Sequence, residues 1–216
     1  MAEFVDKRIY YETPFAVIVA LILILSGQIN TKKFKSENLL AEKTKFHLLS
    51  NLTKLSFTTP VGKPETIGAD RLALAAAVVH FYPQKHNLVI GLGSCITYNF
   101  INKYNEFLGG GISPGLEMRL KALNYYTAKL PLVKADSNTP LIGYDTQTNI
   151  LSGVILGIAY ELEGFIDEYS KKFDNFNVLL TGGDMAYLAS HLKKKIFADS
   201  ELIFKGLYAI SQVNNP

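Results

Sequence analysis

The most apolar run of the chain lies near its N-terminus, in PFAVIVALILILSG from Pro14 to Gly27. Its uninterrupted part, Phe15 to Leu25, is shorter than the roughly 18 to 20 residues that span a bilayer. The residues before it carry charges of both signs, whereas a signal peptide begins with positive charge. Valine and isoleucine are abundant, as in a strand that is buried on both faces of a sheet. We therefore predict a buried strand here, with an export or anchor segment as the alternative.

Further along, helical and strand patterns alternate. Residues 31–46 form a lysine-rich helix candidate, HLLS at 47–50 forms a short strand candidate, and residues 58–65 form a loop with two prolines and a glycine. Alanines and leucines at helical spacing then predict a buried helix that begins near Asp70 and ends before Pro83. The following NLVIGLGSCITYNFINKYNEFLGGGI predicts a β-meander, with a glycine turn and then a polar turn at residues 102–105.

The second half of the chain continues this alternation. A helix is predicted after Pro114, with leucines 116, 120 and 123 on one face, followed by a loop at residues 131–145. The longest helix candidate is Thr148 to Lys171, in which small residues suggest close helix packing: Gly153, Gly157 and Ala159. NVLLTGGDMAYLASHL then predicts a strand, a glycine turn and a helix. Strands that feed glycine turns and helices predict an α/β protein.

Composition and charge narrow the function classes. The chain has 216 residues with 48% hydrophobic and 19% charged residues, which is typical of a globular protein. The net charge is +3, so we expect no nucleic-acid partner, and we expect no membrane partner either.

The single cysteine, Cys95, excludes an intrachain disulfide and is interpreted as a small core residue. The four histidines lack metal-ligand spacing, so we expect no protein metal site. Aromatic pairs such as Tyr125 and Tyr126 are interpreted as core or subunit-interface residues.

Two glycine turns are candidates for binding phosphate. One joins Gly91 to Gly93 and precedes Ser94, and the other contains Gly182 and Gly183. At such turns, backbone N–H groups can approach phosphate oxygens because no side chain stands in the way. Neither turn is a Walker motif or a GxGxxG fingerprint, so each turn alone is weak evidence for a phosphate-binding site.

Five motifs between Pro64 and Asp184 together resemble the type III pantothenate kinases, which have the actin/hexokinase/Hsp70-like ATPase fold. GADR at 68–71 matches the family's GxDR, and GLGSCITYN at 91–99 follows D-x-G-T-x-x-T-x-D except at its acids and first threonine. FLGGGISPGLEMRLKAL with TAKLP, DTQTNILSG, and TGGD match three further signatures. The resemblance covers about residues 35 to 213. It implies ribonuclease H-like lobes with mixed sheets flanked by helices: a partial N-terminal lobe at 1–83 and a C-terminal lobe at 84–216.

The resemblance also implies an activity, the phosphorylation of pantothenate by ATP to 4′-phosphopantothenate, which is the first step of coenzyme A biosynthesis. Asp70 matches the residue that accepts the proton of the pantothenate hydroxyl. The implied pantothenate contacts are Gly68, Ala69, Asp70, Arg71 and Thr146, and the implied ATP contacts are Gly93, Ser94, Gly182 and Gly183. Magnesium, a cytoplasmic location and a homodimer that completes the active site are implied as well.

Several family features are absent from the sequence. The first phosphate loop, D-x-G-N-T, is not found, so we expect an incomplete N-terminal lobe. Gly91 replaces the aspartate that binds potassium or ammonium, Asn99 replaces another acid, and Val61 replaces a tyrosine of the pantothenate site. We therefore expect weak monovalent-cation activation and poor ATP affinity. Two alternatives remain: a catalytically impaired relative that binds ligand or regulates, and an incomplete reading of an intact gene.

Overall fold

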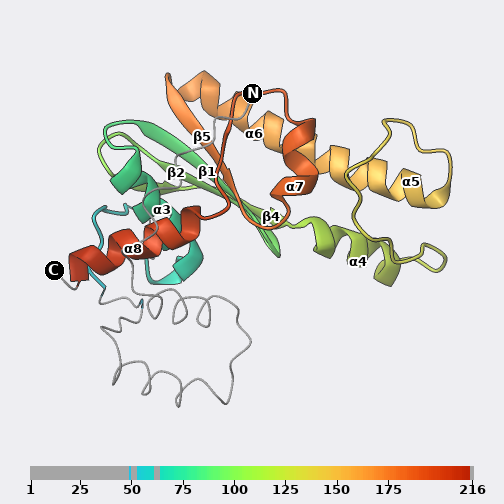
Figure 1. The fold of residues 1–216 in the computed structure, drawn as a ribbon, viewed down its shortest axis with the longest axis horizontal. Coiled ribbons are helices and arrows are strands. Elements are labelled where there is room, and N and C mark those ends of the chain that lie inside the picture. Colours follow the sequence, from blue (N-terminus) through green and yellow to red (C-terminus); the bar gives the residue numbers. More distant parts are fainter. Residues whose placement is uncertain (1–48, 50–52, 61–63, 215–216) are drawn as a thin grey trace, which may run out of the picture.

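The structure is a computed structural model that describes residue 49, residues 53–60 and residues 64–214 (Figure 1). The predicted strand at residues 15–25, the helix candidate at 31–46 and Val61 lie outside the described residues, as does most of the HLLS segment.

The centre of the protein is a mixed sheet in the order β3-β2-β1-β5-β6, with β4 also paired to β2 (Figure 1). Strand β1 (His86–Leu92) runs antiparallel to β2 (Cys95–Ile101) and parallel to β5 (Phe176–Thr181). The short β6 (Phe197–Ala198) is parallel to β5. The predicted meander is confirmed, and its third strand is divided into β3 (Phe107–Gly109) and β4 (Ile112–Pro114), both antiparallel to β2.

Two helices, α3 (Ala69–Phe81) and α8 (Leu202–Asn214), cover one face of the sheet (Figure 1). Helix α3 has strong helix formers in its interior and ends before Pro83, which confirms the helix predicted from near Asp70. Seven consecutive side chains from Ala73 to Val79 are buried. They pack with the residues of β1, β2 and β5 that point to this face: Val89, Ile101 and Leu179.

The other face is covered by one long helical segment, Thr146–Lys172. It consists of α5 (Thr146–Leu151), a π-helical turn (Ser152–Leu156) and α6 (Gly157–Lys172), so it begins two residues before the predicted start. Asp145 caps it, since its carboxylate accepts a hydrogen bond from the Thr148 backbone N–H at 2.7 Å. Among the described helices this segment alone is long and apolar enough to cross a membrane, but its apolar face packs on the sheet and forms the core.

Shorter elements complete the described part of the chain. Helix α4 (Leu116–Tyr126) confirms the helix predicted after Pro114, although Leu123 is only partly buried. The remaining elements are a 3₁₀ turn at Pro64–Thr66, α7 (Met185–Leu188) and a 3₁₀ turn at Ala189–His191. Residues 131–145 form a loop, as expected.

Three interpretations of single residues need correction. A Cβ added at Gly153 or Gly157 would meet no atom within 4 Å, so the close helix packing predicted there is wrong for the single chain. Tyr125 and Tyr126 are 80% and 81% exposed, so they are not core residues, and an interface role stays a prediction. Cys95 is only partly buried. Spacing along a helix shows which residues share a face, but not what that face contacts.

Candidate active site

The two glycine turns lie at the same edge of the sheet. Strands β1 and β5 are parallel neighbours, so the turns that follow them emerge side by side. The Asp184 backbone N–H donates to the Leu92 carbonyl at 3.4 Å, which links the second turn to the first. Gly182 has φ +109°, and a Cβ there would lie 2.1 Å from the Leu92 oxygen, so this position requires glycine.

The N-terminus of α4 joins the same two turns. The Gly115 backbone N–H donates to the Ser94 carbonyl at 3.1 Å, immediately before α4 begins. The Leu116 N–H donates to the carboxylate of Asp184. Burial raises the pKa of that carboxyl, and the negative charge of Glu117 raises it further. A helix N-terminus beside two glycine turns is an arrangement that favours phosphate groups.

The GADR segment begins α3 and contacts the β1–β2 hairpin. The Arg71 Nε–H donates to Asn99 Oδ1 at 2.6 Å, its Nη2 donates to the Tyr98 carbonyl at 3.3 Å, and its guanidinium carbon lies 5.4 Å from the centre of the Phe107 ring. Burial lowers the pKa of Arg71, and the neighbouring Asp70 opposes that shift, so the group stays cationic. Arg71 is thereby held over β2 with part of its guanidinium available to a ligand.

Asn99 connects Arg71 to the rest of the hairpin. It is fully buried, and its Nδ2 donates to the Val89 carbonyl at 3.2 Å and to Thr97 Oγ1 at 3.1 Å. A Cβ at Gly91 would lie 2.8 Å from the same Thr97 oxygen and 3.3 Å from Leu74 Cδ1 of α3. The first turns of α3 therefore lie directly over the hairpin whose turn carries Gly93 and Ser94.

Thr146 is placed apart from these groups. It is the first residue of α5, and α5 lies at the opposite end of the molecule from α3 (Figure 1). Arg71 contacts the middle of β2, the strand that follows the turn with Gly93 and Ser94. The turn with Gly182 and Gly183 contacts the same hairpin at Leu92. Within one chain, the predicted pantothenate residues are thus divided between two distant places.

Comparisons with known proteins identify the family. A family model described as type III pantothenate kinase matches residues 23–168. A Cytophaga hutchinsonii protein named type III pantothenate kinase is 45% identical over 171 residues, which are 79% of this chain and 73% of the relative. One of the same name from Christiangramia forsetii is 44% identical over 178 residues, 82% of this chain and 73% of the relative. This chain belongs to the type III pantothenate kinase family.

A solved structure agrees with this membership at the level of the fold. A Campylobacter jejuni protein described as a conserved Baf family transcriptional activator superimposes with a TM-score of 0.54 at 25% identity, covering 73% of this chain and 68% of that chain. The predicted family and fold class, an α/β fold of the actin-like ATPase type with a mixed sheet flanked by helices, are therefore confirmed.

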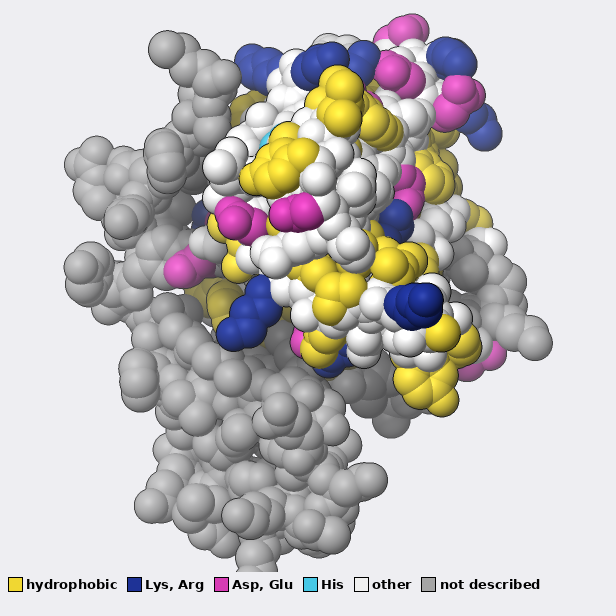
Figure 2. Space-filling model, turned by 90° about the vertical axis from the view of Figure 1, so that its right-hand side faces the viewer, with side chains coloured by type: hydrophobic (Ala, Val, Ile, Leu, Met, Phe, Trp, Pro, Cys, Tyr) yellow, Lys and Arg dark blue, Asp and Glu magenta, His cyan; other side chains and the backbone are white. Residues whose placement is uncertain are grey.

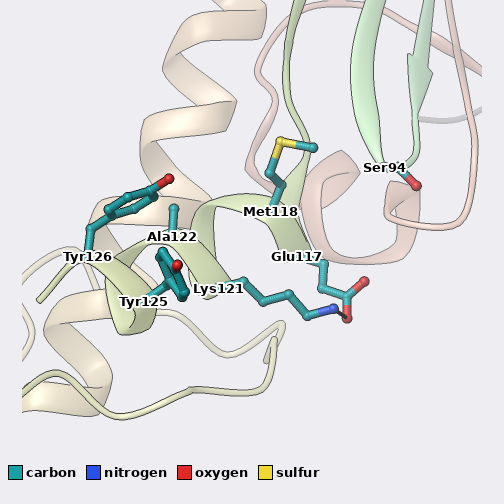
Figure 3. A pocket seen from close by; sticks show the side chains of 7 residues that line it. All are labelled: Ser94, Glu117, Met118, Lys121, Ala122, Tyr125 and Tyr126. Carbon is teal, nitrogen blue, oxygen red and sulfur yellow. Dashed lines mark ion pairs between the residues drawn. The ribbon is translucent and has the colours of Figure 1, made fainter.

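In this pantothenate kinase family member, Ser94 borders an open cavity of about 460 Å³ along α4 (Figure 3). Glu117 and Lys121 form an ion pair at 2.8 Å on its wall, and Tyr125 and Tyr126 line the end away from Ser94 (Figure 3). The Ser94 side chain is exposed, so its hydroxyl is accessible to a ligand.

Sequence reasoning did not identify several groups that shape this site. The carboxylate of Asp184 holds the start of α4, although the TGGD motif already marked that turn. The role of Asn99 as a bridge between α3 and the hairpin, and the contact of Gly115 with Ser94, have no signal in the local sequence.

Proposed function

We propose that this chain transfers the γ-phosphoryl group of ATP to the primary hydroxyl of pantothenate, giving 4′-phosphopantothenate and ADP, the first step of coenzyme A biosynthesis. The observation that carries the proposal is the contact of the GADR helix with the hairpin that bears the Gly93–Ser94 turn, through Arg71 and Asn99. A kinase of this kind must hold an alcohol beside a bound triphosphate, and catalysis is largely positioning and charge stabilisation.

Each residue has a role in that reaction. Asp70 accepts the proton as the pantothenate oxygen attacks the γ-phosphorus and the bond to the β,γ-bridging oxygen breaks. Arg71 pairs with the pantothenate carboxylate, beside the backbone of Gly68 and Ala69. The ATP phosphates lie against the backbone of Gly93, Gly182 and Gly183 and the hydroxyl of Ser94.

Magnesium neutralises phosphate charge when it is bound with ATP. The described residues include no group of three or more His, Cys, Asp and Glu side chains that could hold a metal ion. Mg²⁺ in kinase sites is usually bound by substrate phosphates, water and one or two carboxylates.

The direct test is an assay of ADP formation by the full chain with ATP, magnesium, ammonium and pantothenate, with 4′-phosphopantothenate detected by mass spectrometry. We expect ADP formation that requires pantothenate. Calorimetric binding of pantothenate or nucleotide without turnover would contradict the kinase proposal and favour the alternative, a ligand-binding or regulatory relative.

We also propose that the protein is a homodimer in which α5 of one protomer completes the pantothenate site of its partner. Thr146 begins α5 and Asp70 lies in the first turn of α3, and these two helices lie at opposite ends of the described part of the chain (Figure 1). A second chain would unite the two residues in one site. The face at the α5 end of the molecule carries hydrophobic side chains (Figure 2). The strongly exposed apolar residues on α4 and the following loop are Tyr125, Tyr126, Leu141, Ile142 and Tyr144. Such a patch is typical of an interface.

The variant Ile142→Asp tests this dimer. Ile142 is 82% exposed, so a charge there should leave the protomer folded but oppose burial in an interface. We expect sedimentation to show a monomer, with a raised KM for pantothenate. The matched control is Tyr104→Asp, which changes a 71% exposed side chain on the β2–β3 turn and should leave the dimer intact. An active wild-type monomer would contradict the interface.

Gly91 makes a prediction about cation dependence. A carboxylate at this position could hold a monovalent cation, whereas glycine offers no side-chain oxygen. We expect potassium or ammonium to change wild-type turnover little. Gly91 is not among the glycines with positive φ, so strain at a new side chain would come mainly from Thr97, with a smaller contribution from Leu74, and not from the backbone.

The test therefore removes the Thr97 hydroxyl first. In a Thr97→Ala background, Gly91→Asp should confer activation by potassium or ammonium, and Gly91→Ala should not. Strong activation of the wild type, or identical behaviour of the two Gly91 variants, would show that the cation idea is wrong.

We propose a cytoplasmic location, with no nucleic-acid or membrane partner. The net charge of +3 and the free Cys95 support it. Recovery of the full chain only after detergent extraction would contradict it.

A further inference from the structure

One carboxylate outside the proposed site joins four secondary-structure elements. Glu161 of α6 accepts hydrogen bonds from the Tyr98 hydroxyl of β2 at 2.8 Å and the Ser113 hydroxyl of β4 at 2.5 Å. It also forms an ion pair with Arg119 of α4. Arg119 in turn donates from Nε to the Pro114 carbonyl at 2.8 Å and from Nη2 to Ser113 Oγ at 3.3 Å.

This ion pair is largely shielded from water. The side chains of Arg119 and Glu161 are only 22% and 23% exposed. Burial by itself raises the pKa of the Glu161 carboxyl, but the hydrogen bonds from Ser113, Arg119 and Tyr98 together hold that pKa below its ordinary value. Glu161 is therefore ionised at neutral pH, and its loss would leave the Arg119 charge without its partner.

The segment that this carboxylate holds contacts the phosphate turn directly. Ser113 and Pro114 of β4 pair with Ile96 and Cys95 of β2, next to the turn. One residue further, the Gly115 N–H donates to the Ser94 carbonyl at 3.1 Å. The fit is tight, because a Cβ on Gly115 would lie 2.0 Å from the Gly93 oxygen. A shift of the β4–α4 junction must therefore move the Gly93–Ser94 turn.

We propose that Glu161 is a positioning residue for nucleotide binding: through Ser113 and Arg119 it fixes the β4–α4 junction, and the junction fixes the Gly93–Ser94 turn against the ATP phosphates. This role rests on the proposed kinase function. Glu161 itself touches no substrate. On α3, Arg71 is held by Asn99 and by the Tyr98 backbone carbonyl, and that carbonyl belongs to a residue whose backbone is fixed by the pairing of β2 with β1. We therefore expect the loss of Glu161 to affect ATP binding more than pantothenate binding.

The variant Glu161→Gln keeps the size of the side chain and removes its charge. We expect the KM for ATP to rise about tenfold, as for the loss of one charge-assisted hydrogen bond, with the KM for pantothenate nearly unchanged. Arg119→Lys, which cannot reproduce the bond from Nε to Pro114, should show the same ATP-specific change. Glu168→Gln is the matched control on α6, because Glu168 is 70% exposed and pairs with Lys171 at the surface.

Cys95 provides a second readout that needs no activity. It is the single cysteine of the chain, adjoins Ser94 and pairs with Pro114. We expect a thiol reagent to modify Cys95 several-fold faster in Glu161→Gln than in the wild type or in Glu168→Gln. The reason is that Cys95 is the first residue of β2, and the start of this strand is less firmly held in Glu161→Gln.

The outcomes separate this inference from the proposed function. An active wild type with unchanged ATP KM and unchanged Cys95 reactivity in Glu161→Gln overturns the positioning role. A lowered Tm with equal changes in both KM values also overturns it, since it marks a general structural role. A wild type that binds no nucleotide contradicts the kinase function and the ATP role together, and faster Cys95 modification would then show only that Glu161 holds the turn.

Discussion

Replacing Asp70 by asparagine is expected to lower kcat by about 1,000-fold, a typical contribution of a general base. Asparagine has the same shape as aspartate but cannot accept the proton of the pantothenate hydroxyl. Asp70 lies in the first turn of α3, where it is partly exposed, and its Oδ1 lies 2.5 Å from the position of a Cβ at Gly68. The carboxylate thus lies against a glycine and is partly open to solvent. The measurement is the steady-state rate of 4′-phosphopantothenate formation.

The control for this prediction is Glu65→Gln, which neutralises an exposed carboxylate on the 3₁₀ turn just before α3. It should leave kcat close to that of the wild type. Calorimetry should show that Asp70→Asn still binds ATP and pantothenate, so that the loss lies in the chemical step. Turnover of Asp70→Asn at the wild-type rate would show that Asp70 is not the general base for the pantothenate hydroxyl.

Replacing Gly206 by alanine is expected to lower the free energy of unfolding by about 3 kcal/mol, at the upper end of typical overpacking effects. Gly206 of α8 is buried where this helix crosses α3, and a Cβ there would lie 1.8 Å from the Ala73 carbonyl oxygen and 2.5 Å from its carbon. These are backbone atoms, so neither helix can relieve the contact by a side-chain rotation. For a protein of this size, the expected fall in Tm is about 6 to 12 °C.

Gly164→Ala provides the opposite result as a control. Gly164 lies in α6 on an exposed face, and a Cβ there meets nothing within 4 Å. Alanine should raise the free energy of unfolding by up to about 1 kcal/mol, because glycine is the poorer helix former. Urea unfolding of both variants gives the comparison, and changes of the same sign would show that the helix crossing at Gly206 is not as close as described.

Much of the fold could be predicted because its signals are local. The alanine-rich pattern that begins at Asp70, the stop at Pro83 and the glycine turn between two apolar runs depend on neighbouring residues, and the structure has each of them. The boundaries of the long helix were less accurate, since the capping box of Asp145 and Thr148 starts it two residues before its apolar pattern.

The sequence by itself determined the family, the order of helices and strands from α3 to β5, and the two glycine turns, because motif order and hydrophobic period are properties of the chain read along its length. Only the tertiary structure decided which glycine is packed closely: Gly206 is, whereas Gly153 and Gly157 are not. It also decided that Arg71 meets Asn99, 28 positions away, and that Tyr98 meets Glu161, 63 positions away. The period of a helix or strand specifies which side chains share a face, but the partner of that face is set by how distant segments pack together.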